Sequence, residues 1–351
     1  MSGKRVAKRS NPQALMIILI LVLSGAIAAV LGLRGFFDKP EIPPEQPGTE
    51  TPGSQTSGTQ DPAGSNTPGQ SGSDVSGSET PNEPVRTNIR KEDCYIILLS
   101  GVDKGNGGAD TNILVSFDAK NGTINCVSIP RDSAFYINGE SHKINYAYNK
   151  GGMKLLASSI SEGLGIPVDY TVKVDLTGFV KLVDAIGGVE FDVPIDMDYD
   201  DPYQNLSIHI AKGLQKLDGQ NALNVVRFRH NNDGSGYRNQ DLGRISTQQA
   251  FLKAVAKQTL QLSNLDKVSE LVKIFNKYVD TSLSLGNLAW LGKEAINIGT
   301  ENIAFSTLPG AWSSSQSLYL LDQNAVLDLV NTTLNPYQED RISSDLHLVA
   351  G

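Results

Sequence analysis

The 351-residue chain is poor in the side chains that most often carry covalent or metal chemistry. It has two cysteines and four histidines, and neither group has the spacing of a zinc site or of a nucleophile beside its base. Positive charge is also scarce. The formal net charge is -8 and the pI is about 5.1, so we expect no binding to nucleic acid. Cys94 and Cys126 could form a disulfide in an oxidising exterior, and two buried free thiols are an equally good alternative.

A long segment after residue 40 lacks what a folded core needs. Between Pro40 and Val85 there is no aromatic residue, Lys or Arg, whereas Pro, Gly, Ser and Thr recur throughout. Such a composition cannot bury enough apolar surface to offset the entropy of folding. We therefore predict that residues 34–87 form a disordered extracellular linker, which tethers the following domain flexibly.

One apolar run near the N-terminus is long enough to cross a bilayer. Ala14–Leu33 contains twenty residues without a charge, which favours a transmembrane helix. Basic residues are denser before this run than after it. The positive-inside rule therefore places residues 1–13 in the cytoplasm and the C-terminal domain outside a single-pass cell membrane protein. A cleaved signal peptide is the alternative, but the length of the run favours an uncleaved anchor.

The remaining chain, residues 88–337, is predicted to form one α/β domain, because strand-like apolar runs alternate with amphipathic stretches. The predicted strands are Tyr95–Leu99, Ile113–Phe117, Cys126–Ile129, Tyr170–Val174, Val189–Val193, a strand around Ile208 and Ile210, and Ile303–Leu308. The predicted helices are two that follow the caps Asp175 and Asp218, and those at Leu242–Leu260, Leu265–Tyr278, Leu285–Ile298 and Asp322–Leu334. The tail, residues 338–351, is predicted to be poorly ordered.

Charged residues cluster between Ser100 and Asp132, where three of the predicted strands end. Asp103, Asp110, Arg131 and Asp132 are each expected just outside a strand. Ligands bind at strand ends in open α/β sheets, so these residue types predict a site for a metal and an anion.

A second cluster concentrates cations in an otherwise acidic chain: Arg227, Arg229, His230, Arg238, Asp241, Arg244 and Gln248. Asp241 is placed to cap the next predicted helix, on which Arg244 and Gln248 share a face near the N-terminus. The helix dipole and Arg244 would then converge on an anion. Arg227 and Arg229 share a face only if the chain is extended there, and they diverge if the preceding helix continues.

Phosphoryl groups suit both clusters. Arginine binds phosphate oxygens in a fork, and carboxylates can hold Mg2+ that bridges them, so a diphosphate is the natural ligand. The alternative treats the aspartates as turn and cap residues and the arginines as solvated surface.

Several motifs in this order resemble the LytR-CpsA-Psr family of cell-wall glycopolymer ligases. The resemblance covers about Tyr95 to Leu334 and includes these pieces: GVD (Gly101–Asp103), Ala109 and Asp110, SIPRD (Ser128–Asp132), KINYAY (Lys143–Tyr148), Gly151 and Gly152, DAIGGVEFDVP (Asp184–Pro194), LDGQNAL (Leu217–Leu223), RFRH (Arg227–His230) and DLGR (Asp241–Arg244). It implies a mixed central β-sheet flanked by helices. It also implies a phosphotransferase outside the membrane that moves a glycopolymer phosphate, teichoic acid for example, from a polyprenyl diphosphate carrier to peptidoglycan.

The resemblance also implies roles for single residues. Asp103 and Asp110 correspond to Mg2+ ligands, and Asp241 to an acidic residue that acts as a base or orients an arginine. The implied diphosphate-binding residues are Arg131, Lys143, Arg227, Arg229 and Arg244, with Asn145 and Gln248 at polar positions beside the phosphates. The family's prenyl chain occupies an apolar groove, which would involve here either the helix of Phe179 or that of Leu252.

The sequence departs from the family pattern at two places. Gly108 and Ala109 stand where relatives often have Arg and Ser, and Thr247 stands where they often have a second arginine. Lys104 and Arg238 could compensate. Two other functions stay open: a hydrolase that cleaves polyprenyl diphosphates at the same site, with a pyrophosphatase side activity as a related case, and a non-catalytic surface protein that binds wall polymer or regulates.

Overall fold

The computed structural model describes residues 37–44, 88–103, 108–202, 206–237 and 268–349, together with positions 243, 246, 247, 250, 251, 254, 255 and 258. The predicted anchor at 14–33 and most of the predicted linker lie outside these residues. None of the helices in the described ranges combines the length and the apolar character that a bilayer span requires.

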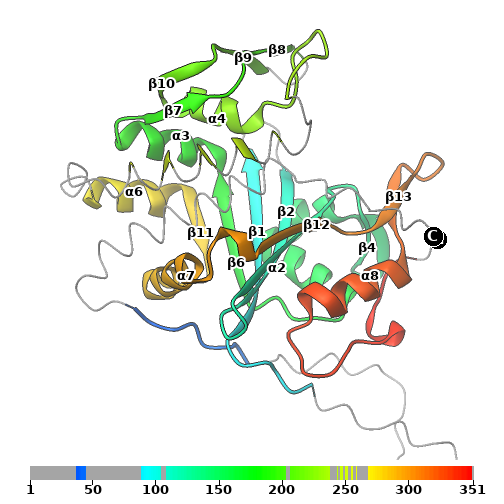
Figure 1. Ribbon diagram of the computed structural model, residues 1–351. Coiled ribbons are helices and arrows are strands. Elements are labelled where there is room, and N and C mark those ends of the chain that lie inside the picture. Colours follow the sequence, from blue (N-terminus) through cyan, green and yellow to red (C-terminus); the bar gives the residue numbers. More distant parts are fainter. Residues whose placement is uncertain are drawn as a thin grey trace, which may run out of the picture.

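A six-stranded mixed sheet forms the centre of the domain, in the order β11-β6-β1-β2-β3-β12 (Figure 1). Its strands are β1 Cys94–Asp103, β2 Gly108–Asp118, β3 Thr123–Ile129, β6 Tyr170–Asp175, β11 Val279–Thr281 and β12 Ile303–Thr307. β2 is antiparallel to both β1 and β3, whereas β6 is parallel to β1 and β12 is parallel to β3. The predicted mixed α/β sheet is confirmed.

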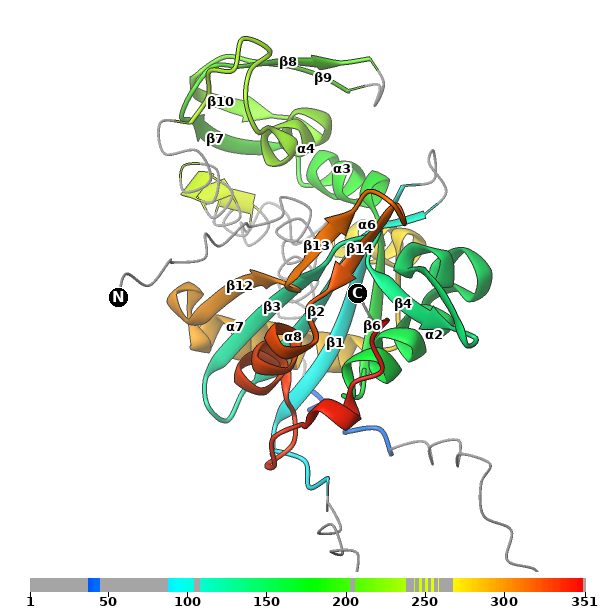
Figure 2. The same ribbon diagram turned by 90° about the vertical axis from the view of Figure 1, so that its right-hand side faces the viewer.

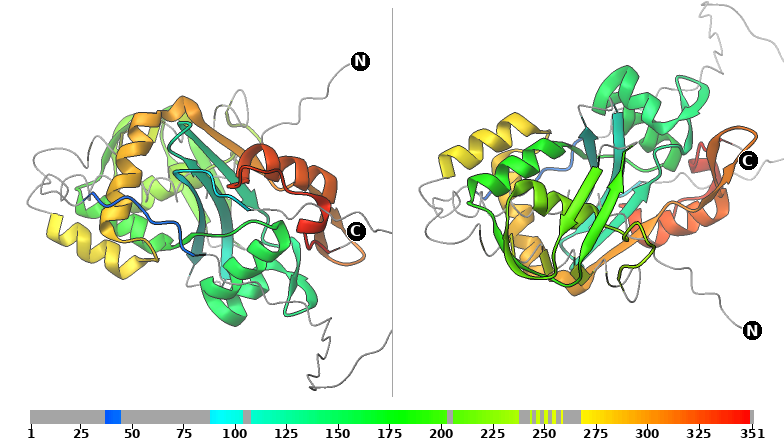
Figure 3. Two further views of the ribbon diagram at one scale, coloured as in Figure 1. Left: turned by 90° about the horizontal axis from the view of Figure 1, so that it is seen from below. Right: turned by 90° about the horizontal axis from the view of Figure 1, so that it is seen from above.

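Helices cover both faces of this sheet, which explains why its strands are apolar without alternation (Figure 3). Side chains of β1 alternate between two cores: Tyr95, Ile97 and Leu99 enter the first, and Ile96 and Leu98 enter the second. The helices of the first core are α3 Leu176–Ala185, α4 Gly219–Arg227, α6 Val268–Tyr278 and α7 Leu285–Ile298. Those of the second are α2 Ile144–Leu164 and α8 Gln323–Leu329, which a π-helix at Val330–Leu334 continues.

Four two-stranded antiparallel sheets complete the domain. They pair β4 Ala134–Ile137 with β5 Glu140–Lys143, β7 Val189–Val193 with β10 Gly213–Leu217, β8 Met197–Asp201 with β9 Leu206–Ile210, and β13 Gly310–Ser313 with β14 Leu318–Leu321. Figure 1 shows β7 to β10 with α3 and α4 above the end of the sheet at which β1 ends.

Helix caps follow the predicted chemistry. The carboxylate of Asp175 accepts a hydrogen bond from the Thr177 amide at the start of α3, and Asp218 accepts one from the Asn221 amide at the start of α4. α7 occupies the predicted range Leu285–Ile298. These local signals were sufficient because each combines a capping residue with an apolar face.

A short segment, residues 37–44, packs along the opposite end of the sheet and corrects the predicted tether at 34–87. We call it the strap; it is drawn in blue below α7 in Figure 1. The hydroxyl of buried Tyr95 donates to the Pro40 carbonyl at 2.9 Å, Tyr170 donates to the Glu41 carbonyl, and Ile42 packs on the first core. Asn287 also donates to the Asp38 carbonyl at 2.9 Å. The chain composition predicted no contacts here, yet the strap binds mainly through its backbone carbonyls, which every sequence has.

The C-terminal tail corrects a second prediction, because residues 338–349 pack on the domain. Leu346 is buried in the second core, and the Arg341 guanidinium lies 2.9 Å from the Asp345 carboxylate. Two apolar residues of the tail, Leu346 and Leu348, therefore contact the second core, whereas Ile342 is 42% exposed. Both cysteines are free and buried, which settles the alternatives in favour of thiols.

Candidate functional site

The ends of several strands meet at one edge of the sheet, which we call the site edge. β1, β3, β6 and β12 all run toward it, ending at Asp103, Ile129, Asp175 and Thr307, and β2 starts from it. Asp103 is the last residue of β1, and Asp110 lies inside β2. The prediction that both lie just outside strands is wrong, because the strands extend beyond their apolar runs. The shared edge is nevertheless the expected one.

A β-bulge occurs at Asp110. Gly101 pairs with Thr111, whereas the next residue of β1, Val102, pairs with Ala109, so Asp110 has no partner opposite it. A bulge bends its strand and re-aims the side chains around it, and bulges are common beside active sites. The site edge thus has an irregular backbone at one of the two predicted metal ligands.

A buried polar network holds this bulge, and the sequence analysis missed it. The Ser100 hydroxyl donates to the Asn112 side-chain oxygen at 2.8 Å, and the Asn112 amide donates to the Ala109 carbonyl at 3.3 Å. Asn112 and Ser100 are both fully buried. The amide of Asn112 therefore spans Asp110 and fixes the backbone on its far side. A buried Asn at the start of an apolar strand was the signal that could have revealed it.

The third strand leads to Arg131. The ladder between β2 and β3 ends at the pair Asn112 and Ile129, and Arg131 lies two residues beyond it, in a turn that the Ser133 amide closes on the Pro130 carbonyl at 2.9 Å. Arg131 therefore follows the end of β3, at the edge of the sheet where β1 ends and β2 starts.

Asp132 links the two cations of the site. Its carboxylate lies 3.0 Å from the Lys143 ammonium and 3.8 Å from the Arg131 guanidinium, counted to the same oxygen. The Asn145 amide donates to the Arg131 carbonyl at 3.3 Å, which joins the start of α2 to this loop. Arg131, Lys143 and Asn145 are thus brought together as predicted, and all three are at least partly exposed.

The second predicted cluster is described only in part. α4 ends at Arg227, and its cap Phe228 is extended (φ -60°, ψ 134°) and buried. Arg227 is thus the last residue of the helix and Arg229 lies beyond it, so the chain is neither extended through both residues nor helical through both, and neither alternative holds in full. The remaining predicted members, Asp241, Arg244, Gln248 and Arg238, lie outside the described residues.

The described positions between 243 and 258 are all helical, in agreement with the predicted helix. Phe251 is buried against Phe191 with ring centroids 5.1 Å apart. Thr247 is also buried, and its hydroxyl donates to the Gly243 carbonyl at 2.9 Å. Thr247 therefore turns inward, toward its own helix.

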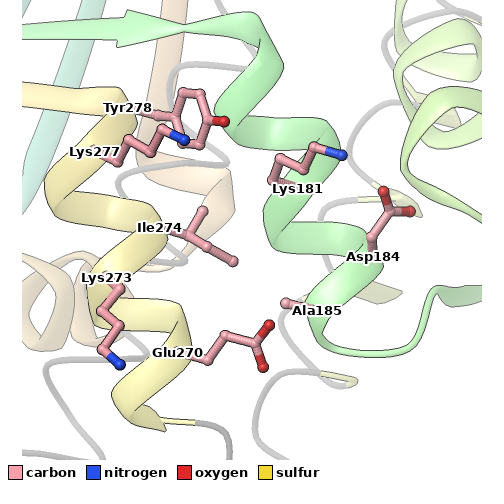
Figure 4. A pocket seen from close by; sticks show the side chains of 8 residues that line it. All are labelled: Lys181, Asp184, Ala185, Glu270, Lys273, Ile274, Lys277 and Tyr278. Carbon is pink, nitrogen blue, oxygen red and sulfur yellow. The ribbon is translucent and has the colours of Figure 1, made fainter.

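A groove of about 480 Å³ lies between α3 and α6 (Figure 4). Most of its lining is charged: Lys181, Asp184, Ala185, Glu270, Lys273, Ile274, Lys277 and Tyr278. Phe179, on the helix predicted to border a lipid groove, is instead fully buried in the first core. The charged lining suits a polar ligand and does not match a prenyl chain.

The donor chemistry of the site edge fits Mg2+. Magnesium takes one or two carboxylates in octahedral sites completed by water and substrate phosphate, and Asp103 and Asp110 supply two carboxylates at neighbouring strand ends. Among the described side chains, which exclude those of Asp103 and Asp110, no group of three metal-ligating residues occurs. A group of three or more protein ligands is typical of a metal site built by the protein alone. A magnesium site of the kind expected here uses one or two carboxylates and is completed by water and substrate phosphate.

Comparison with known proteins agrees with the fold and the motifs. The sequence profile of the LytR_cpsA_psr family matches residues 64–335. The chain belongs to the LytR_cpsA_psr family. A relative from Bacillus cereus named polyisoprenyl-teichoic acid–peptidoglycan teichoic acid transferase TagU is 32% identical over 251 residues, 69% of this chain and 79% of its own.

A further relative of this LytR_cpsA_psr protein carries a different description. Regulatory protein MsrR of Staphylococcus aureus is 31% identical over 227 residues, 63% of this chain and 66% of its own. The crystal structure of B. subtilis TagU superposes with a TM-score of 0.51 at 26% identity, covering 72% of this chain and 100% of that one. The family's mixed α/β fold is therefore shared.

Both departures from the family pattern that the sequence analysis noted fall on buried positions. Gly108 and Ala109 are buried at the start of β2, and Ala109 packs in the second core. The second departure is Thr247, which is buried on its own helix. These three residues in this LytR_cpsA_psr protein act in packing.

Proposed function

We propose that this protein is a membrane-anchored phosphotransferase that moves a glycopolymer phosphate from a polyprenyl diphosphate carrier to peptidoglycan. The observation that carries the proposal is the convergence of Asp103, Asp110, Arg131 and Lys143 on one sheet edge in a LytR_cpsA_psr chain. The name of the TagU relative, a teichoic acid transferase, supports the same substrate class.

In this proposal the cations of the site bind the diphosphate. Arg131 and Lys143 face it from the loop after β3 and from the start of α2, and Asp132 restrains both side chains. Arg227, Arg229 and Arg244 would contribute from the second cluster, with Asn145 and Gln248 beside the phosphates. Mg2+ held by Asp103 and Asp110 would neutralise charge on the phosphate oxygens.

The proposed reaction is an in-line displacement. A peptidoglycan hydroxyl attacks the phosphorus that carries the glycopolymer, the bond to the oxygen bridging the two phosphates breaks, and polyprenyl phosphate leaves. Asp241 would accept the proton of the hydroxyl or orient an arginine. Arginine and lysine stabilise the charge that develops on the oxygens, so that the protein needs no covalent nucleophile.

The proposed location is the outer side of the cell membrane. The apolar run Ala14–Leu33 would act as the single anchor, with the basic residues 1–13 inside the cell. Carrier and acceptor would then lie on the same side as the site.

Two substitutions test the proposal in the full-length protein. Asp103→Asn and Arg131→Ala should each abolish polymer transfer in the presence of Mg2+, because each removes charge at the diphosphate. Asp328→Asn and Lys212→Ala, at exposed positions on α8 and after β9, are the matched controls and should transfer normally. Unchanged transfer by both site variants, with circular dichroism showing a folded domain, would reject the proposal.

Product analysis separates transfer from hydrolysis. Incubation with a lipid-linked polymer and peptidoglycan should give a phosphodiester between polymer and wall, whereas a hydrolase would release free polymer phosphate. A regulatory role is the second candidate, because the MsrR relative is named a regulatory protein. That role would be favoured if Asp110→Asn left every cellular effect of the protein unchanged.

A further inference from the structure

One large aromatic side chain is exposed beside the site. Trp312 on β13 is 53% exposed, which is unusual for an indole that has a core available. The hairpin that carries it, Gly310 to Leu321, has no charged residue, in a chain in which 19% of residues are charged. Its turn consists of hydroxyl and amide side chains, Ser314 to Ser317.

The hairpin is fixed directly to the site loop. The Tyr319 amide on β14 donates to the Asp132 carbonyl at 2.9 Å, and the Tyr319 hydroxyl donates to the Leu308 carbonyl at 3.2 Å. Trp312 pairs with Tyr319 across the hairpin, so its backbone position is set by a strand ladder. Figure 2 shows the hairpin in front of the sheet, rising toward the end at which β1 ends.

The Trp312 ring also lies close to Lys143, a residue of the proposed diphosphate site. The Lys143 ammonium lies 5.8 Å from the centroid of the Trp312 ring and 3.0 Å from the Asp132 carboxylate. A group bound at Lys143 is therefore next to an indole ring.

We infer that Trp312 and the turn after it form a saccharide subsite for the sugar nearest the diphosphate or for the acceptor glycan. One face of a pyranose presents C–H groups that stack on an indole, while its hydroxyl rim hydrogen-bonds to neutral polar groups. Ser315 and Gln316, in the turn that follows β13, supply such groups at the tip of the hairpin, and the Ser313 and Ser315 hydroxyls lie 3.1 Å apart. The absence of charge in the hairpin favours a neutral ligand such as a sugar over a phosphate.

This inference rests on the proposed function, since it places a sugar beside the diphosphate. Trp312 binds substrate and takes no part in bond making. Its loss should therefore raise the KM for sugar-bearing substrates and leave kcat nearly unchanged.

Tryptophan fluorescence provides a direct readout, because the chain has two tryptophans. Trp290 is packed against Tyr95 and Phe117, with ring centroids 6.0 and 6.4 Å away, so it serves as a constant background. Three probes would be titrated into the full-length protein in detergent: geranyl diphosphate, a geranyl diphosphate-linked N-acetylglucosamine disaccharide, and an N-acetylglucosamine tetramer. The tetramer represents the acceptor glycan.

The sugar-bearing probes should change the Trp312 emission. Isothermal titration calorimetry, which does not need the reporting indole, should show an affinity for at least one of them about tenfold weaker in Trp312→Ala, and Trp312→Phe should restore part of the loss. Leu214→Ala, at a 70% exposed position on β10, is the matched control and should have no effect. A response to the disaccharide probe alone assigns the donor sugar, and a response to the tetramer alone assigns the acceptor.

Geranyl diphosphate separates the two proposals. If it fails to bind the wild-type protein, the proposed function is wrong. If it binds wild type and Trp312→Ala equally while the sugar probes also bind both equally, the subsite alone is rejected. A Trp312-dependent response to phosphatidylglycerol vesicles without any response to sugar would likewise overturn the subsite and identify a lipid contact.

Discussion

Substituting Asn112 with alanine should damage both the stability of the sheet and the metal site. Asn112 accepts from the Ser100 hydroxyl and donates to the Ala109 carbonyl on the other side of the bulge. All three residues are fully buried, so water cannot replace the lost partner. The substitution leaves a hydroxyl and a carbonyl unsatisfied and frees the backbone at Asp110.

The expected cost follows from these two bonds. Each buried polar group left without a partner costs about 1–3 kcal/mol, so that Asn112→Ala, which leaves two, should lower the free energy of unfolding by about 2–6 kcal/mol. Ser100→Ala leaves one and should cost about 1–3 kcal/mol. Because both substitutions break the same bond, the double variant should cost less than the sum of the single ones.

Urea denaturation of the domain measures these energies, and the Mg2+ dependence of transfer measures the functional effect. Asn112→Ala should displace the backbone that carries Asp110, the proposed Mg2+ ligand. This displacement should weaken the apparent Mg2+ affinity roughly 10- to 100-fold, as loss of supporting contacts does at other metal sites. Ser116→Ala is the control, since the hydroxyl of this buried residue of the same strand makes a weak hydrogen bond, at 3.9 Å to the Cys94 sulfur, and lies away from the bulge. Additive effects of Ser100→Ala and Asn112→Ala, or an Asn112→Ala variant as stable as wild type, would refute the reasoning.

Three further predictions concern ionisable groups. Asp169 binds the Arg90 guanidinium with both carboxylate oxygens, at 2.9 and 2.7 Å. Asp169→Ala leaves this largely buried guanidinium without its partner, so the free energy of unfolding measured in urea should fall by about 3 kcal/mol. The hydrogen bond from His209 to the Asp198 carboxylate raises the pKa of His209. The NMR titration midpoint of His209 should therefore lie above 6.5 in the wild-type protein and should fall in Asp198→Asn. Any stabilisation from this pair is present at low pH and is lost as the pH rises through that midpoint. Burial raises the pKa of Cys126 to about 12, so its thiol should resist iodoacetamide at pH 8 until urea unfolds the domain, and the stability it contributes should decline as the pH rises above 9.

Much of the framework could be predicted, because its signals are local. The strands around Ile96, Leu114 and Val127 are short apolar runs between turn residues, and the caps Asp175 and Asp218 mark helix starts. The convergence of Asp103, Asp110 and Arg131 on one edge also followed from strand ends alone.

The remaining features depend on pairing between distant segments. The bulge at Asp110 exists because β2 has one more residue than β1 between two pairs, and no pattern within β2 reveals that register. The role of Asn112 depends on Ser100 across the ladder, and that of Asp132 on Lys143 beyond a hairpin. Leu346 was assigned to a disordered tail because its partner surface is formed by residues far away in sequence.

The strap at residues 37–44 determines how far the functional site would lie from the membrane. If the proposed anchor ends at Leu33, three residues separate it from Phe37, and an extended chain of that length reaches about 10–14 Å. The base of the sheet would then rest near the lipid headgroups, with the site edge one strand of ten residues, about 33 Å, further out. The strap ends at residue 44 and the described chain resumes at Asn88. Both positions lie at that base, since Asn88 lies against Arg341 and the following Arg90 holds Asp169. Lengthening or shortening the segment between them would therefore leave the site at the same distance from the membrane, and a lipid carrier would have to raise its diphosphate to meet it.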